Sequence, residues 1–104
     1  IAVDKTAGKI YFGVNGTYVN SGNPASGTGA VYTNLPTSSD ETLFPAITNY
    51  LRTGSGTPII KMNFGAPMVS ISSSNSDANG HGSFEYAVPS GFFALNTKNL
   101  AQYG

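Results

Sequence analysis

The feature that most constrains this chain is a strand-and-turn pattern close to its start. In residues 9–14, apolar residues at the even positions alternate with smaller or more polar residues at the odd positions. A period of two is typical of a half-buried β-strand. Asn15-Gly16 follows directly, and this dipeptide tolerates the positive φ angles of a tight hairpin turn. The pattern therefore predicts a strand, a tight turn and a second strand.

The rest of the chain also favours β-structure over helix. Gly, Pro and β-branched residues interrupt every window of helical length. Strands are predicted at residues 1–4, 9–14, 30–33, 43–50, 59–64, 83–88 and 92–96. Loops are predicted at residues 20–29, 52–58 and 70–82. Short strands with turn signals at this spacing indicate an all-β antiparallel sandwich, built as a single domain over residues 1–104.

The same alternation predicts which side chains are buried. In residues 59–64 the even positions are apolar, whereas Lys61 and Asn63 would face water or an interface. Nine apolar side chains are expected to be mostly buried: Ile10, Phe12, Val14, Ile60, Met62, Phe64, Phe84, Phe92 and Leu95.

The composition excludes several classes of function. Five basic residues balance five acidic residues, and only 10% of all residues are charged, against about a quarter in an average soluble domain. This balance excludes the basic footprint of a nucleic-acid-binding protein and a polybasic membrane patch. The absence of Cys excludes disulfides, thiol catalysis and cysteine metal sites. No apolar run approaches the roughly 20 residues of a membrane helix. We therefore expect no nucleic-acid partner, no membrane insertion and no cofactor.

The only histidine, His81, stands between two glycines in a polar segment. A catalytic histidine needs an oriented nucleophile and a carboxylate partner. Asp77 and Glu85 are near in sequence, but no nucleophile motif accompanies them. We interpret His81 as a surface loop residue and expect no enzymatic activity.

Residues 75–80 match the first half of a calcium loop, with oxygen-bearing side chains at positions one, three and five and Gly at position six. Position twelve should be Glu but is Tyr86, and Glu85 falls one residue short. Asn and Asp are also ordinary turn residues. We interpret Asn75 and Asp77 as parts of a metal-free surface turn, with calcium binding as the open alternative.

The six tyrosines suggest a carbohydrate-binding surface, because aromatic faces stack on sugar rings. The alternative is packing on a sheet face, where Tyr is favoured. The candidate ligand or partner surface comprises Tyr11, Tyr18, Tyr32, Asn75, Asp77 and His81.

Several segments together resemble a known family. They are residues 2–4 and 8–18, Ser21-Gly22-Asn23-Pro24-Ala25 with Gly27, Leu43-Phe44-Pro45-Ala46, Asn63-Phe64-Gly65, Phe84-Glu85-Tyr86, Pro89-Ser90-Gly91-Phe92, Ala94-Leu95-Asn96-Thr97 and Asn99-Leu100. In this order they resemble the later part of SPRY (B30.2-like) domains, especially those of bacteriophage structural proteins. The chain departs from the family at Tyr11 and Tyr18, where the family usually has Trp.

The resemblance implies a bent antiparallel β-sandwich of the concanavalin-like jelly-roll type that binds rather than catalyses. In phage proteins it implies an extracellular virion module of the tail or fibre type. Its partners would be other virion chains or a host-surface glycan. The early SPRY strands have no counterpart before Ile1, so we expect upstream sequence or neighbouring chains to supply them, giving a homo-oligomer or filament. A carbohydrate-binding module of a secreted or tail protein is the alternative.

Overall fold

The computed structural model describes residues 1–50 and 56–103. Their elements in chain order are β1 (Ala2–Asp4), β2 (Lys9–Tyr11), β3 (Gly13–Val14), β4 (Thr17–Tyr18), the 3-10 turn η1 (Pro24–Ser26) and α1 (Thr97–Tyr103). The strands form two antiparallel pairs, β1 with β2 and β3 with β4. The expectation of a helix-poor chain with short antiparallel strands is confirmed at this level. The turn predicted at residues 52–58 lies largely outside the described residues.

The first hairpin joins β1 to β2 with Val3 opposite Ile10. The Asp4 carboxylate closes the connecting turn by accepting a hydrogen bond from the backbone N–H of Ala7 at 2.9 Å. Gly8 ends the turn with a φ of 67°, and a Cβ there would lie 2.9 Å from the carbonyl oxygen of Leu35. A side chain at this position would therefore be strained and would also push against a neighbouring segment.

The second hairpin joins β3 to β4 through Asn15-Gly16, as the sequence predicts. Both turn residues have positive φ, 49° for Asn15 and 82° for Gly16, which is the requirement of a type I′ turn. A Cβ on Gly16 would lie 2.7 Å from the ring of Tyr86. Glycine is thus needed here for backbone conformation and for close packing against a distant residue.

Most of the later strands that the sequence predicts are absent. The predicted strand 30–33 is reduced to one bridge between Ile10 and Tyr32, and the strand 83–88 to one bridge between Asn75 and Phe84. The structure assigns no strand to residues 43–50, 59–64 or 92–96. These predictions are wrong for the chain as described, because alternation identifies a segment able to pair but not a partner for it.

The C-terminal helix α1 was not predicted. Asn96 precedes it, and the Asn96 side-chain oxygen accepts a hydrogen bond from the backbone N–H of Asn99 at 2.9 Å. This is the bond of an N-terminal cap, and the seven residues that follow contain neither Gly nor Pro. No helix within the described ranges is long and apolar enough to cross a membrane.

The core is centred on Tyr11, which is only 1% exposed. Its ring meets Tyr18 and Phe92 edge to face, with ring centroids 6.4 and 6.5 Å apart. Tyr11 stands at an odd position of the alternating segment 9–14, so the odd face is the one turned inward at this point. The prediction of one strand over residues 9–14 with Ile10, Phe12 and Val14 inward is wrong, because the segment is divided at Phe12 into β2 and β3 and Tyr11 is its one buried residue.

The predicted apolar core is largely open in the single chain. Ile60, Met62 and Phe64 are 41%, 39% and 40% exposed, respectively. Phe12, Val14 and Leu95 are also exposed, while Ile10, Phe84 and Phe92 are half-buried. The prediction that all nine side chains are mostly buried is wrong for the isolated chain.

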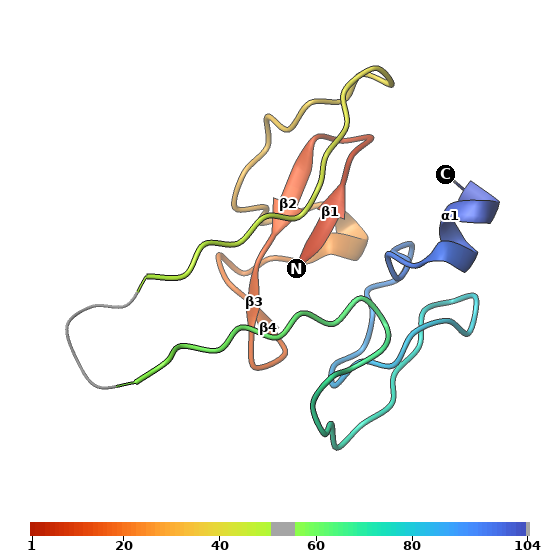
Figure 1. Cartoon of the computed structure of the whole chain (residues 1–104). Helices are drawn as coiled ribbons and strands as arrows, with labels where there is room; N and C mark the ends of the chain where they lie inside the picture. The colour runs from red at the N-terminus through yellow and green to blue at the C-terminus, as the bar shows by residue number, and fades with distance from the viewer. Residues whose placement is uncertain (51–55, 104) are drawn as a thin grey trace.

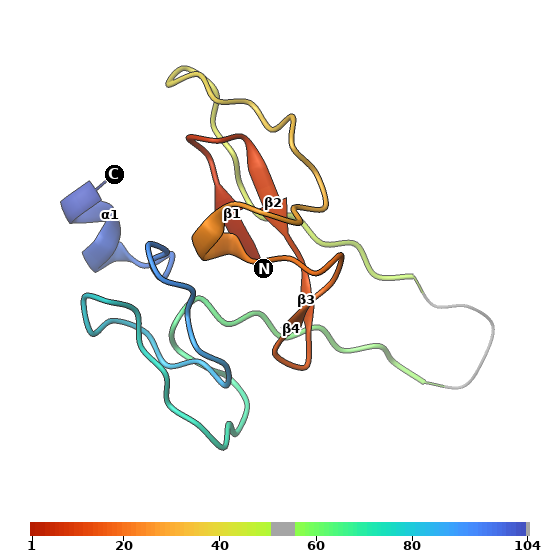
Figure 2. The ribbon, with the colours of Figure 1, turned by 180° about the vertical axis from the view of Figure 1, so that it is seen from behind.

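The molecule consists of two gathered parts and two long extended stretches (Figure 1). The strands β1 to β4 form the first part, and the C-terminal loops with α1 form the second. Residues 41–50 and 56–62 are long stretches without helix or strand, and their ends at residues 50 and 56 reach away from both parts, as the reverse view also shows (Figure 2). The accessible surface is 7626 Å², about 2,000 Å² more than the roughly 5,500 Å² expected of a folded monomer of this mass. The radius of gyration of 15.0 Å likewise exceeds the roughly 13 Å expected.

Candidate functional site

The most organised polar feature of the chain is the buried carboxylate of Asp77, which is 6% exposed. Its Oδ1 accepts hydrogen bonds from the backbone N–H groups of Asn79 and His81, each at 2.9 Å. Its Oδ2 accepts from the backbone N–H of Ala94 at 2.9 Å and from the side-chain amide of Asn99 at 2.7 Å. Four donors from three separated parts of the sequence thus converge on one carboxylate.

These four hydrogen bonds control the charge of Asp77. Burial alone would raise the pKa of the carboxyl group, but the donors from Ala94, His81, Asn99 and Asn79 together lower that pKa to about 2. Hydrogen bonds made to the ionised form stabilise it. Asp77 therefore remains a carboxylate at neutral pH and holds its surroundings in place.

Asn99 extends this arrangement into α1. It is buried, and its side-chain amide also donates to the carbonyl oxygen of Ala94 at 2.8 Å. Its side-chain oxygen accepts a hydrogen bond from the Asn79 amide at 2.9 Å. The ring of Tyr103 stacks on Phe93 with centroids 4.9 Å apart. The helix is thereby tied to residues 77–81 and 93–94.

The prediction of a surface loop at residues 70–82 is wrong at Asp77, which is buried, whereas the other residues of the loop are exposed or half-buried. The carboxylate oxygens that a cation would need already accept N–H donors. The Asn75 side-chain amide donates to the carbonyl oxygens of Phe84 and Glu85. Among the described residues, no three His, Asp or Glu side chains gather where they could hold a metal ion. Residues 77–81 thus form a turn that the Asp77 carboxylate closes by accepting from the backbone N–H groups of Asn79 and His81.

Glu85 forms a second anchored carboxylate in the same part of the molecule. It accepts hydrogen bonds from the hydroxyl of Ser72, from the backbone N–H of Ser72 at 2.6 Å and from that of Ser73 at 3.3 Å. The hydroxyl of Ser72 is the largest of the influences that lower the pKa of Glu85. Its carboxylate is thus occupied in holding residues 72–73 beside residue 85.

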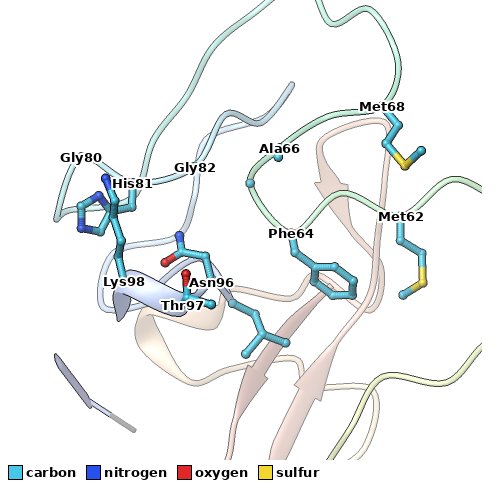
Figure 3. A pocket seen from close by; sticks show the side chains of 12 residues that line it. Met62, Phe64, Ala66, Met68, Gly80, His81, Gly82, Asn96, Thr97 and Lys98 are labelled. Atoms are coloured by element: carbon cyan, nitrogen blue, oxygen red, sulfur yellow. The ribbon is translucent and has the colours of Figure 1, made fainter. Parts of the chain in front are cut away.

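A pocket of about 570 Å³ opens beside this region. Its apolar lining includes Met62, Phe64 and Leu95, and its polar lining includes His81 and Lys98. Figure 3 shows His81 and Lys98 together on one side and Phe64 and Met62 on the other. The pocket is shallow and mostly apolar, and the side chains of Met62 and Phe64 belong to the exposed face of residues 59–64.

The candidate ligand or partner residues fall into two groups. Tyr11 is buried and contacts Tyr18, so its ring offers no surface to a sugar; burial also raises the pKa of Tyr18. Tyr32 is exposed. The second group, Asn75, Asp77 and His81, shares one loop, in which the Asp77 backbone N–H donates to the carbonyl oxygen of His81 at 2.9 Å.

Sequence reasoning missed Asn99 and Ala94, the partners of Asp77 from the end of the chain. The available signal was Asn96 followed three residues later by Asn99, a spacing that allows a helix cap. That signal predicts the start of a helix but says nothing of a carboxylate more than fifteen residues earlier.

Comparisons of the chain with protein families, with curated proteins and with solved structures found no match. The resemblance to SPRY domains therefore stays a prediction that rests on the sequence segments alone.

Proposed function

We propose that this chain is a non-enzymatic structural and binding module of a bacteriophage virion, of the tail or fibre type. It would act by assembling with other chains and by presenting loops at the particle surface. In that assembly, its strands would contribute to an antiparallel SPRY-like β-sandwich.

The observation that carries the proposal is the apolar surface left open by the single chain. Phe44, Tyr50 and Ile59 are each at least three-quarters exposed, and the face of residues 60–64 is half open. The excess accessible surface of about 2,000 Å² is comparable to what each subunit buries in an obligate assembly. Clusters of exposed large apolar side chains mark sites of protein association.

The polar geometry supports a non-catalytic role. Asp77 is the only buried carboxylate within the described residues, and its oxygens are engaged by four N–H donors. It is therefore unavailable as the base that would activate His81 or a nucleophile. We expect no hydrolysis of glycan, ester or peptide substrates, and His81→Ala to leave the background rate unchanged.

Mass spectrometry of purified particles tests the virion assignment. Particles of the phage whose genome encodes this chain would be purified by density gradient and digested. Peptides from this chain should be enriched with the known structural proteins, while a replication protein of the same genome serves as the control. Depletion of the chain to the level of that control would contradict the proposal.

A glycan-binding module is the second candidate, and the exposure of Tyr32, at 51%, favours it. An exposed tyrosine ring can stack on a sugar face. Binding to a panel of bacterial surface glycans should then fall in Tyr32→Ala but not in Tyr86→Ala, a tyrosine of similar exposure. The absence of any glycan binding would remove this candidate.

A further inference from the structure

Residues 59–64 combine three properties that are rarely found together in a monomer. They are exposed or half-buried throughout, residues 59–63 run without a turn until a bend begins at Phe64, and none of the six takes part in a backbone–backbone hydrogen bond between described residues. Backbone N–H and C=O groups that remain unpaired along an extended segment are a template for another strand.

The side chains of this segment are sorted by face. Ile60, Met62 and Phe64 have nearly equal exposures of 41%, 39% and 40%, and Met62 and Phe64 line the same pocket (Figure 3). Lys61 and Asn63 alternate with these residues. Lys61 is exposed, whereas Asn63 is half-buried and its side-chain amide donates to the carbonyl oxygen of Ser83 at 2.9 Å. The pattern is that of a strand whose apolar face is only half covered by its own chain.

The neighbouring extended stretch is less suited to pairing. Pro45 interrupts residues 43–50, and proline has no N–H to donate to a ladder. In residues 59–64 every residue carries a backbone N–H, and Lys61 is the single charge. The protection that natural edge strands derive from charge and proline is thus minimal in this segment.

We propose that residues 59–64 pair antiparallel with the same residues of a second copy of this chain, about a twofold axis that passes beside Met62. This inference rests on the proposed assembly function and names the surface that would assemble. The pairing adds a strand to each copy and joins the two half-open apolar faces into one.

The faces determine the register. Residues directly opposite one another in an antiparallel pair point to the same side of the sheet. With Met62 opposite Met62, Ile60 lies opposite Phe64 and Lys61 lies opposite Asn63. A shift by one residue would set apolar side chains against polar ones on both faces. The register centred on Met62 also keeps the two Lys61 side chains from lying directly opposite each other.

Charge and area favour a second copy as the occupant. The chain has a formal net charge of zero at neutral pH, so two copies do not repel each other. The excess surface of about 2,000 Å² is spread over the whole chain, and it is large enough to include the area that a subunit of an obligate homodimer buries. A twofold axis makes one patch complementary to itself, so no further surface is needed for closure.

Disulfide trapping tests this register, because the chain has no cysteine of its own. In Met62→Cys, the two new thiols would stand opposite each other with Cα atoms about 4.5–5.5 Å apart, within the range of a disulfide. Ile60→Cys is the matched control, on the same face and of nearly equal exposure. Its two thiols would be offset by four residues, or about 13 Å.

Under mild oxidation at micromolar concentration, we expect at least about tenfold more linked dimer from Met62→Cys than from Ile60→Cys. Equal cross-linking of the two variants, or more from Ile60→Cys, would overturn the register. Sedimentation of the unmodified chain gives a second measurement that does not depend on either variant. A dimer is expected, and a monomer would overturn self-association.

The two proposals can fail separately. If the chain sediments as a monomer but is enriched in purified particles, the proposed virion role stands. The exposed face of residues 59–64 would then bind a different chain rather than a second copy. Cross-linking at Met62 combined with depletion from particles would retain the dimer and remove the virion role.

Discussion

The two gathered parts of this molecule are held together in different ways. Near the N-terminus, β1 to β4 are joined by backbone pairing, and the Tyr11 ring fills the space beside them. Near the C-terminus, side chains do the joining, since Asp77 and Asn99 connect residues 77–81, residue 94 and α1. The comparison shows that pairing of neighbouring strands follows from a short sequence pattern. A polar cluster such as that around Asp77 instead requires residues far apart in the sequence to come into contact.

The largest expected effect is on the N-terminal part. Tyr11→Ala removes a ring that is 1% exposed and has two aromatic neighbours. Truncation of a buried aromatic side chain to alanine costs about 3–5 kcal/mol. Chemical denaturation should report this loss of stability. A loss below about 1 kcal/mol would show that the first part does not depend on an aromatic core.

The corresponding test of the C-terminal part is Asp77→Asn. An amide cannot accept from all four donors, because one side of it is itself a donor. Hydrogen exchange at Asn79, His81 and Ala94 should accelerate, while exchange in β1 and β2 should change little. Equal acceleration of hydrogen exchange in both parts would show that they unfold as one unit. The two parts would then not be stabilised independently.

Acid should weaken the C-terminal part selectively. The pKa of Asp77 is about 2 in the folded chain, against 3.8 for the unperturbed group. Because the folded pKa is depressed, the stabilisation is fully present above about pH 4 and is lost as the pH falls through 2. Thermal melts between pH 5 and pH 2 should show this loss, and Asp77→Asn should flatten the profile. An unchanged profile in that variant would assign the acid response to other carboxylates.

The exposed segment of residues 59–64 is tested by Met62→Lys. In the proposed dimer this change sets two like charges directly opposite each other, which destabilises a strand pair. The dissociation constant should rise at least about tenfold, as measured by sedimentation. Met68→Lys adds the same charge at another exposed methionine and should have a smaller effect. Equal effects would indicate a response to net charge alone.

The smallest expected effect returns to Tyr11. Its hydroxyl is buried and has no hydrogen-bond partner among the described residues. A buried hydroxyl without a partner carries a desolvation penalty of about 1–3 kcal/mol. Tyr11→Phe should therefore be neutral or should stabilise the chain by about 1 kcal/mol in denaturation experiments. Destabilisation would show that the hydroxyl is hydrogen-bonded in solution.

By itself, the sequence determined the local turns and the β-character of the first twenty residues. Asn15-Gly16 forms the predicted turn because few other dipeptides tolerate two successive positive φ angles. The strands on either side follow from their neighbours in the chain. In residues 59–64 the predicted division of faces does not appear in the exposures, because the polar Asn63 is half-buried whereas Ile60, Met62 and Phe64 are exposed.

Only the tertiary structure decided which face is covered and which polar residues meet. Alternation sets a period of two but does not say which face turns inward, so Tyr11 rather than Phe12 became the core residue. The partners of Asp77 at residues 94 and 99 could not be predicted, because no local pattern specifies a contact across that distance. Period and turn geometry are properties of adjacent residues, whereas burial depends on which distant surfaces come into contact.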